Sequence, residues 1–164
     1  MNTIKKHFFS FMIIIIIFPF ALLSGCKKNS AQTKIFSNGY YSAEAKDFDS
    51  DGWKEFISIY VHNGRIITVE YNAKNASGFI KSWDLDYMRN MYINNRTYPS
   101  KYVREYTSAL LVFQDPGHID AVVGATRSYY LFTHLAEAVV EQARMGNRQI
   151  KIVELSPYKE SSNP

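Results

Sequence analysis

Alternating apolar and polar residues on either side of Asn63-Gly64 predict a β-hairpin over Trp53 to Ala73. We expect a three-residue loop that begins at His62, because this loop pairs Ile59 with Ile67 across the hairpin. A two-residue Asn63-Gly64 turn would shift the pairing and divide the apolar side chains between the two faces. The expected register instead places on the core face Ile57, Ile59, Val61, Ile67, Val69 and Tyr71.

The rest of the pattern adds two outer strands and three helices. Short apolar runs predict strands over Gly39 to Lys46 and Gln149 to Leu155. Apolar residues spaced three and four apart predict helices over Ile80 to Tyr92, Pro99 to Gln114 and Arg127 to Met145. The pattern therefore predicts one α+β domain over residues 39–156, in which a small antiparallel sheet with a central β-hairpin is packed by two or three helices.

Residues 1–25 have the pattern of an export signal, with Lys5 and Lys6 before an apolar run from Phe8 to Leu23. The sequence Leu23-Ser24-Gly25-Cys26 resembles a bacterial lipobox, which implies cleavage before Cys26 and lipidation of its sulfur. A plain transmembrane anchor is the alternative, although the run is short for a span of about 20 residues. We expect a lipidated tether over residues 26–38, a frayed tail over 157–164 and attachment to the extracytoplasmic face of the cell membrane or to an outer membrane.

Charge and cysteine content exclude several classes of protein. The formal net charge of +4 falls to +2 when Lys5 and Lys6 are removed. This balance does not support nucleic-acid binding, for which about 6–10 phosphate contacts are typical. Because Cys26 is the only cysteine, a lipidated chain has no disulfide or thiolate metal site, and any redox chemistry requires a cofactor held by other means.

No metal site is expected from the remaining residues. The histidines of the exported part are scattered, without the spacing of metal ligands. A calcium loop beginning at Asp47 has glycine at its sixth position, but its twelfth position is Ser58 instead of an acidic residue. The segment Asp47 to Gly52 is therefore interpreted as a turn rich in Asp, Ser and Gly.

The segment from Asp120 to Ser128 contains the candidate functional residues. Gly124 and Ala125 allow another backbone or a ligand to approach closely, and Thr126 stands at the expected N-cap of the last helix. The free N–H groups and partial positive charge of a helix N-terminus suit a phosphate group. Thr126 is therefore either an ordinary capping residue or a residue that holds a phosphate.

The pattern Asp-x-x-x-Gly-Ala-Thr, followed by a long helix, resembles the site of the FMN-binding domain family. The resemblance covers about Gly39 to Gly146 and includes a series of weaker motifs in the same order, together with the lipobox. These motifs are Gly39-Tyr40-Tyr41, Asp51-Gly52-Trp53-Lys54, Asn63-Gly64, Tyr87 to Met91, Tyr98-Pro99 and Leu110-Leu111.

This resemblance implies an electron carrier and not an enzyme with a substrate of its own. FMN would be joined to Thr126 as a phosphoester by a separate flavin transferase that uses FAD. Gly124 and Ala125 would allow close approach, and the N–H groups of Arg127 and Ser128 would meet the phosphate. Asp120 would be read by the transferase or would be an ordinary loop aspartate. The Arg127 side chain would either neutralise the phosphate or remain a solvated surface arginine. Electron partners would be a membrane quinone or flavin oxidoreductase and an extracellular acceptor.

Two other functions remain open from the sequence. Val123 stands where the family usually carries Ser or Thr, which favours a non-flavinylated surface or binding lipoprotein of the same fold. An enzyme acting on a small molecule is the second alternative. Against it, the chain contains no Ser/His/Asp order, phosphate loop or metal cluster that indicates catalysis.

Overall fold

A four-stranded sheet forms the centre of the fold in the computed structural model, which describes residues 36–155. The strands are β1 (Gly39–Ala45), β2 (Lys54–His62), β3 (Arg65–Lys74) and β4 (Lys151–Val153), in the order β3-β2-β1-β4. β2 pairs antiparallel with both β1 and β3, whereas β4 pairs parallel with β1. The predicted α+β class is confirmed, and the sheet is mixed and not wholly antiparallel.

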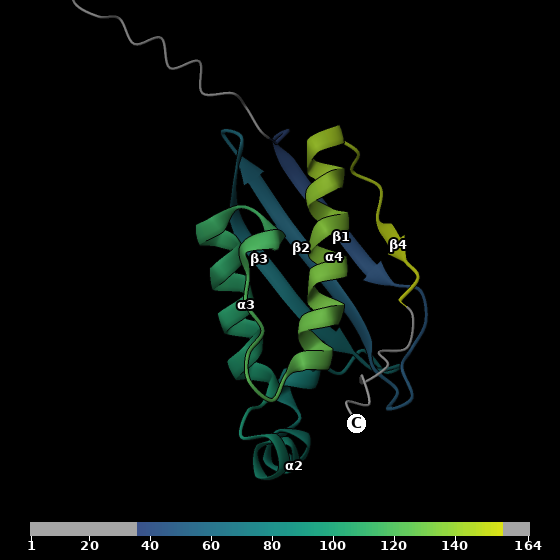
Figure 1. The fold of residues 1–164 in the computed structure, drawn as a ribbon. Coiled ribbons are helices and arrows are strands. Elements are labelled where there is room, and N and C mark those ends of the chain that lie inside the picture. The colour runs from purple at the N-terminus through teal and green to yellow at the C-terminus, as the bar shows by residue number, and fades with distance from the viewer. Residues whose placement is uncertain (1–35, 156–164) are drawn as a thin grey trace, which may run out of the picture. The chain divides into compact units, whose positions relative to one another are not determined.

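The parallel pairing of β4 follows from where the last helix, α4 (Thr126–Met145), ends. Ser37 donates a backbone hydrogen bond to the carbonyl of Ala143, and Arg148 donates to the carbonyl of Asn38. The chain therefore leaves α4 beside the start of β1 and enters β4 in the same direction. Figure 1 shows β4 as a short strand at this edge, and it is shorter than the predicted run from Gln149 to Leu155.

The hairpin forms at the predicted place but in a different register. His62 pairs with Arg65, so the turn contains only Asn63 and Gly64, both with positive φ values of 52° and 74°. A bulge between Tyr60 and Val61 then shifts the pairing, and Ile59 faces Val69 in place of Ile67. Because Val61 pairs with Ile66 and Tyr60 pairs with Thr68, Ile67 is left without a partner on β2. The apolar side chains of the two strands therefore stay on one face despite the two-residue turn. Ile67 is 50% exposed, while Ile66 is buried in its place.

The predicted helix over Ile80 to Tyr92 is a short 3-10 helix, η2 (Lys81–Trp83), followed by α2 (Leu85–Asn95). The side chain of Asp84 accepts a hydrogen bond from the N–H of Tyr87 at 2.9 Å and so fixes the start of α2. Ile80 forms a bridge with Lys74 and therefore belongs to the edge of the sheet, not to a helix. None of the α2 residues is buried, because this helix lies outside the main core.

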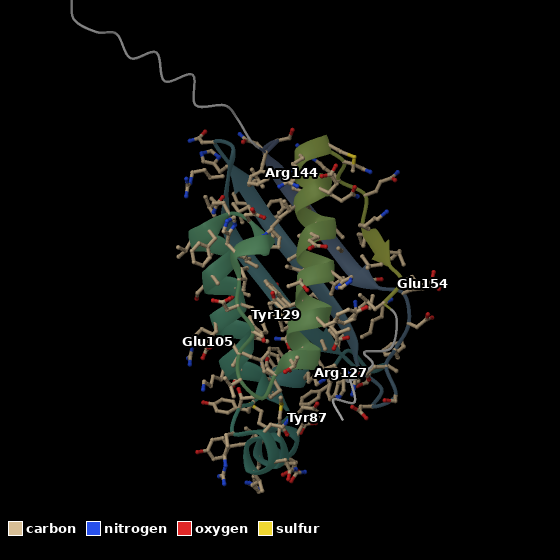
Figure 2. All side chains as sticks on the ribbon, in the orientation of Figure 1. Tyr87, Glu105, Arg127, Tyr129, Arg144 and Glu154 are labelled. Atoms are coloured by element: carbon tan, nitrogen blue, oxygen red, sulfur yellow. The ribbon has the colours of Figure 1, made fainter. Side chains whose placement is uncertain are left out.

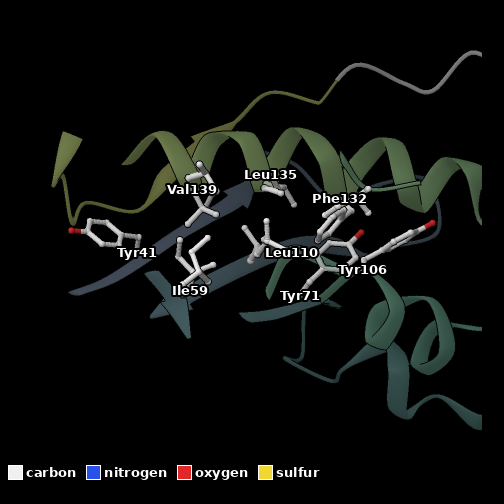
Figure 3. Close-up of a cluster of buried hydrophobic side chains, with 14 of the residues drawn as sticks. Tyr41, Ile59, Tyr71, Tyr106, Leu110, Phe132, Leu135 and Val139 are labelled. Atoms are coloured by element: carbon white, nitrogen blue, oxygen red, sulfur yellow. The ribbon is translucent and has the colours of Figure 1, made fainter. Parts of the chain in front are cut away.

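Two longer helices cover one face of the sheet. α3 (Pro99–Phe113) packs on β3, and α4 packs on β1 and β2, as Figure 1 shows. Their buried side chains meet those of the hairpin in a single core that includes Tyr41, Ile59, Tyr106, Leu110, Phe132 and Val139 (Figure 3). The apolar face of α4 is buried and consists of Leu131, Phe132, Leu135, Ala136, Val139, Val140 and Ala143. On α3, the buried residues include Tyr102, Tyr106 and Leu110, whereas Phe113 near its end is exposed.

The packed domain includes residues that we expected in the tether. Phe36 is buried in the core, and the carbonyl of Ser37 accepts a hydrogen bond from the Tyr41 hydroxyl at 3.0 Å. The predicted signal peptide, Cys26 and the tail over 157–164 lie outside the described residues. Among residues 36–155, no helix has the length and apolar character needed to cross a membrane.

Candidate functional site

The loop before α4 is held against α3 by one tyrosine. The Tyr106 hydroxyl accepts a hydrogen bond from the N–H of Val122 at 3.2 Å and lies 3.3 Å from the carbonyl oxygen of Ala125, to which it donates. The N–H of Ala125 also donates to the carbonyl of Val122, which closes a turn around Val123 and Gly124. Val123 therefore lies at the tip of the turn, where its side chain is 91% exposed.

Gly124 is required by the approach of another part of the backbone. Its φ is 79°, and a Cβ at this position would lie 2.1 Å from the carbonyl oxygen of Asn95 at the end of α2. The Asn95 side chain also donates a hydrogen bond to the Gly124 carbonyl at 3.3 Å. The close approach predicted for Gly124 is therefore one between loop and helix, which fixes the position of the loop.

Thr126 is the first residue of α4, and the prediction that it is the N-cap is wrong. Ala125 is the N-cap, it is buried, and it has no side chain that can accept a hydrogen bond from the helix. The backbone N–H groups of Thr126, Arg127 and Ser128 make no hydrogen bond within residues 36–155. Thr126 itself is exposed, so its hydroxyl is accessible beside three unsatisfied donors.

Five of the six predicted binding residues line one cavity of about 610 Å³, namely Gly124, Ala125, Thr126, Arg127 and Ser128. Residues of η2 and α2, namely Lys81, Tyr87 and Met91, also line this cavity. Figure 2 shows Tyr87 and Arg127 at this end of the domain, with Arg144 at the other end of α4. Asp120 is not part of this cavity, because it lines a separate hollow on the side of α3 that also contains Val123.

The Arg127 side chain is held by the turn that follows β1. Its guanidinium forms ion pairs with Asp49 at 3.0 Å and with Asp51 at 3.5 Å. Asp49 is fixed in turn, because its other carboxylate oxygen accepts the N–H of Trp53 at 2.8 Å. The Arg127 side chain is 45% exposed, and these two carboxylates balance its charge. Both alternatives for Arg127 stay predictions. The segment from Asp47 to Gly52 forms the predicted turn, in which the N–H of Gly52 donates to the carbonyl of Asp49 at 3.0 Å.

Two buried charged residues beside this cavity were missed from the sequence. Lys81 is 6% exposed, and its ammonium lies 4.7 Å from the centre of the Tyr87 ring and 5.6 Å from that of Trp53. Glu55 is 5% exposed, and burial raises its pKa from 4.5 to about 6 despite the opposing charge of Lys81. The alternation of β2 indicates an inward position for Glu55, two residues before Ile57, but no sequence signal identifies Lys81.

The fold and the cavity define a small α+β domain with an uncapped helix N-terminus that opens on a ligand-sized hollow. No protein-family model matches the chain. The chain is 37% identical over 128 residues to the 15 kDa lipoprotein of Treponema pallidum (strain Nichols), across 78% of this chain and 87% of that protein. It therefore belongs to the family of this lipoprotein. The lipoprotein part of the prediction is confirmed, whereas FMN binding stays a prediction.

A solved structure shows the same fold. The crystal structure of a protein from Clostridium perfringens superimposes with a TM-score of 0.71 and 32% sequence identity, covering 74% of this chain and 99% of that one. Almost the whole of that protein therefore corresponds to the domain described here.

Proposed function

We propose that this lipoprotein is a membrane-anchored flavoprotein that carries FMN as a phosphoester on Thr126 and transfers electrons outside the cytoplasm. The observation that carries the proposal is the position of Thr126. It is exposed at the first position of α4, on a cavity of about 610 Å³, beside three backbone N–H groups that have no partner among residues 36–155. An attachment residue must be accessible to a transferase, and a helix N-terminus suits the phosphate group.

The residues of the cavity fit FMN in size and in chemistry. Its volume lies within the range of about 300–1,000 Å³ that is usual for small-molecule sites. Tyr87, Met91 and Leu131 supply apolar surface for a ring system, and Ser50 and Ser128 supply hydroxyl groups. When bound, FMN supplies the electron-transfer chemistry, while the protein attaches it, orients it and limits its contact with water. The Arg127 side chain is given no part in phosphate binding, because Asp49 and Asp51 hold it.

The partners follow from this role. A flavin transferase would act on the exposed loop around Val123 and would read Asp120, which is exposed on the same loop. A membrane quinone or flavin oxidoreductase would donate electrons, and an extracellular compound would accept them. Membership of a lipoprotein family supports anchoring to a membrane, and we place the lipid on Cys26 and the domain on the extracytoplasmic face.

Intact mass tests the proposal directly. The exported protein is produced with and without a matching flavin transferase, and we expect a gain of one FMN minus water only with the transferase. Thr126→Ala should abolish the gain and leave a folded domain, because the Thr126 hydroxyl caps no helix. Thr126→Ser keeps a hydroxyl, so partial modification is expected. An unmodified parent that also shows no flavin fluorescence after denaturing electrophoresis would contradict covalent attachment.

A non-flavinylated binding lipoprotein of the same fold is the second candidate, and Val123 favours it. The Val123 side chain is 91% exposed at the tip of the loop, so a transferase that needs a hydroxyl there would meet an apolar surface instead. Val123→Ser separates the two functions, because nothing in the fold depends on this side chain. If only Val123→Ser gains the flavin mass, the natural protein is a domain of this fold that binds without carrying a covalent flavin.

A further inference from the structure

Lys81 is a buried lysine whose ammonium makes no direct polar contact among residues 36–155, although the charge of Glu55 acts on it. Lysine is almost never fully buried unless it is paired. Within residues 36–155, the Lys81 ammonium forms no hydrogen bond or ion pair, and its close contacts are the rings of Tyr87 and Trp53. The Lys81 ammonium is not among the fully enclosed polar atoms of the described residues, and Lys81 lines the cavity. A ligand in this cavity can therefore supply the hydrogen-bonding partner that the described residues do not give the Lys81 ammonium.

The side chain lies on the cavity that contains the first turn of α4. Lys81 lines it together with Thr126, Arg127 and Ser128. Arg127, the second cation on this cavity, is balanced by Asp49 and Asp51. Lys81 is therefore the cation of the cavity with no ion pair among the described residues, and it shares the cavity with the N–H groups of the first turn of α4.

We propose that Lys81 and the N–H groups of the first turn of α4 together bind the phosphate group of a phosphate monoester. The three N–H groups supply directed hydrogen bonds, and the lysine supplies a compact positive charge that attracts phosphate as a point charge. The identity of the ligand as FMN rests on the proposed function. After attachment to Thr126, the phosphate would be a diester that keeps one negative charge, so the same contact would hold it.

The test uses the lipoprotein extracted from membranes in detergent, from a host that has no flavin transferase. The parent protein is titrated with FMN and with riboflavin, which has the same ring system but no phosphate. We expect FMN to bind at least about tenfold more tightly, because hydrogen bonds to charged groups contribute about 1.5–3 kcal/mol. Inorganic phosphate should displace FMN in competition.

Lys81→Met removes the charge and keeps most of the side-chain volume. We expect its affinity for FMN to fall about tenfold to a hundredfold, while its affinity for riboflavin stays the same. Lys101→Met is the matched control. This substitution changes the net charge by the same amount, but Lys101 lines the separate hollow that contains Asp120. Thermal melting checks that each variant is folded, and Lys81→Gln replaces the methionine variant if that one does not melt cooperatively.

Three results would overturn the inference. These are equal affinity of the parent for FMN and riboflavin, an unchanged FMN affinity in Lys81→Met, and an equal loss of affinity in Lys101→Met. Failure of covalent attachment to Thr126 is a separate result, because these titrations contain no transferase. A protein that gains the flavin mass but binds FMN independently of Lys81 would keep the proposed function and lose this inference.

Discussion

Replacing Glu55 with glutamine should make the protein more stable near neutral pH and leave it unchanged in acid. Glu55 lies on the core side of β2, 5% exposed, where burial is the main cause of its raised pKa. Asp49 raises this pKa further, and Lys81 and Arg127 lower it without offsetting burial. The folded protein therefore retains the Glu55 proton to a higher pH than the unfolded chain does.

The size of the effect follows from the two pKa values of Glu55. They are about 6 in the folded state and 4.5 for an unperturbed carboxyl. Since one pKa unit corresponds to about 1.4 kcal/mol, ionising the buried carboxyl lowers the free energy of unfolding by about 2 kcal/mol. Below the lower value both states are protonated and the effect is absent. As pH rises from 4.5 to about 6, the folded state binds more protons than the unfolded state, so stability falls.

Urea unfolding, followed by the fluorescence of buried Trp53 and by circular dichroism, measures this difference. We expect Glu55→Gln to gain about 2 kcal/mol at about pH 7.5 and nothing at about pH 4. Glu44→Gln is the control, and we expect it to lower the free energy of unfolding near neutral pH. Hydrogen bonds from Lys54 and Lys74 lower the pKa of Glu44, so the stability that the ionised Glu44 contributes is lost as the solution is acidified. A Glu55→Gln variant no more stable than the parent near neutral pH would refute the argument.

Two further predictions test the packing. Ile59→Asp places a charge in the core and should lower the free energy of unfolding by several kcal/mol. Ile67→Asp, at the exposed bulge residue, should change the free energy of unfolding by no more than about 0.5 kcal/mol. Equal losses would mean that the bulge is misplaced. The Thr97 hydroxyl is buried without a partner among residues 36–155, so Thr97→Val should raise stability by about 1 kcal/mol in the same assay, and a loss would show that the hydroxyl is hydrogen-bonded in solution.

The sequence by itself determined the elements whose signals are local. Pro99 marks the start of α3, and Gly146, with φ of 70°, marks the end of α4, because proline and glycine set the backbone angles of their own positions. The buried face of α4 and the position of the hairpin follow equally from periodicity and from Asn63-Gly64. The five residues from Gly124 to Ser128 lie on one cavity because they are consecutive at one helix end.

Only the tertiary structure decided the features that depend on contacts between distant segments. The bulge near Ile67 forms because it keeps both strands of the hairpin in the core, and no residue in the turn specifies it. Arg127 pairs with Asp49 and Asp51, and Lys81 reaches the cavity, because β1, η2 and α4 converge at one end of the domain. Charge alone marks these residues as surface residues in a sequence, since burial of a charge is set by the packing around it and not by the residues beside it in the chain.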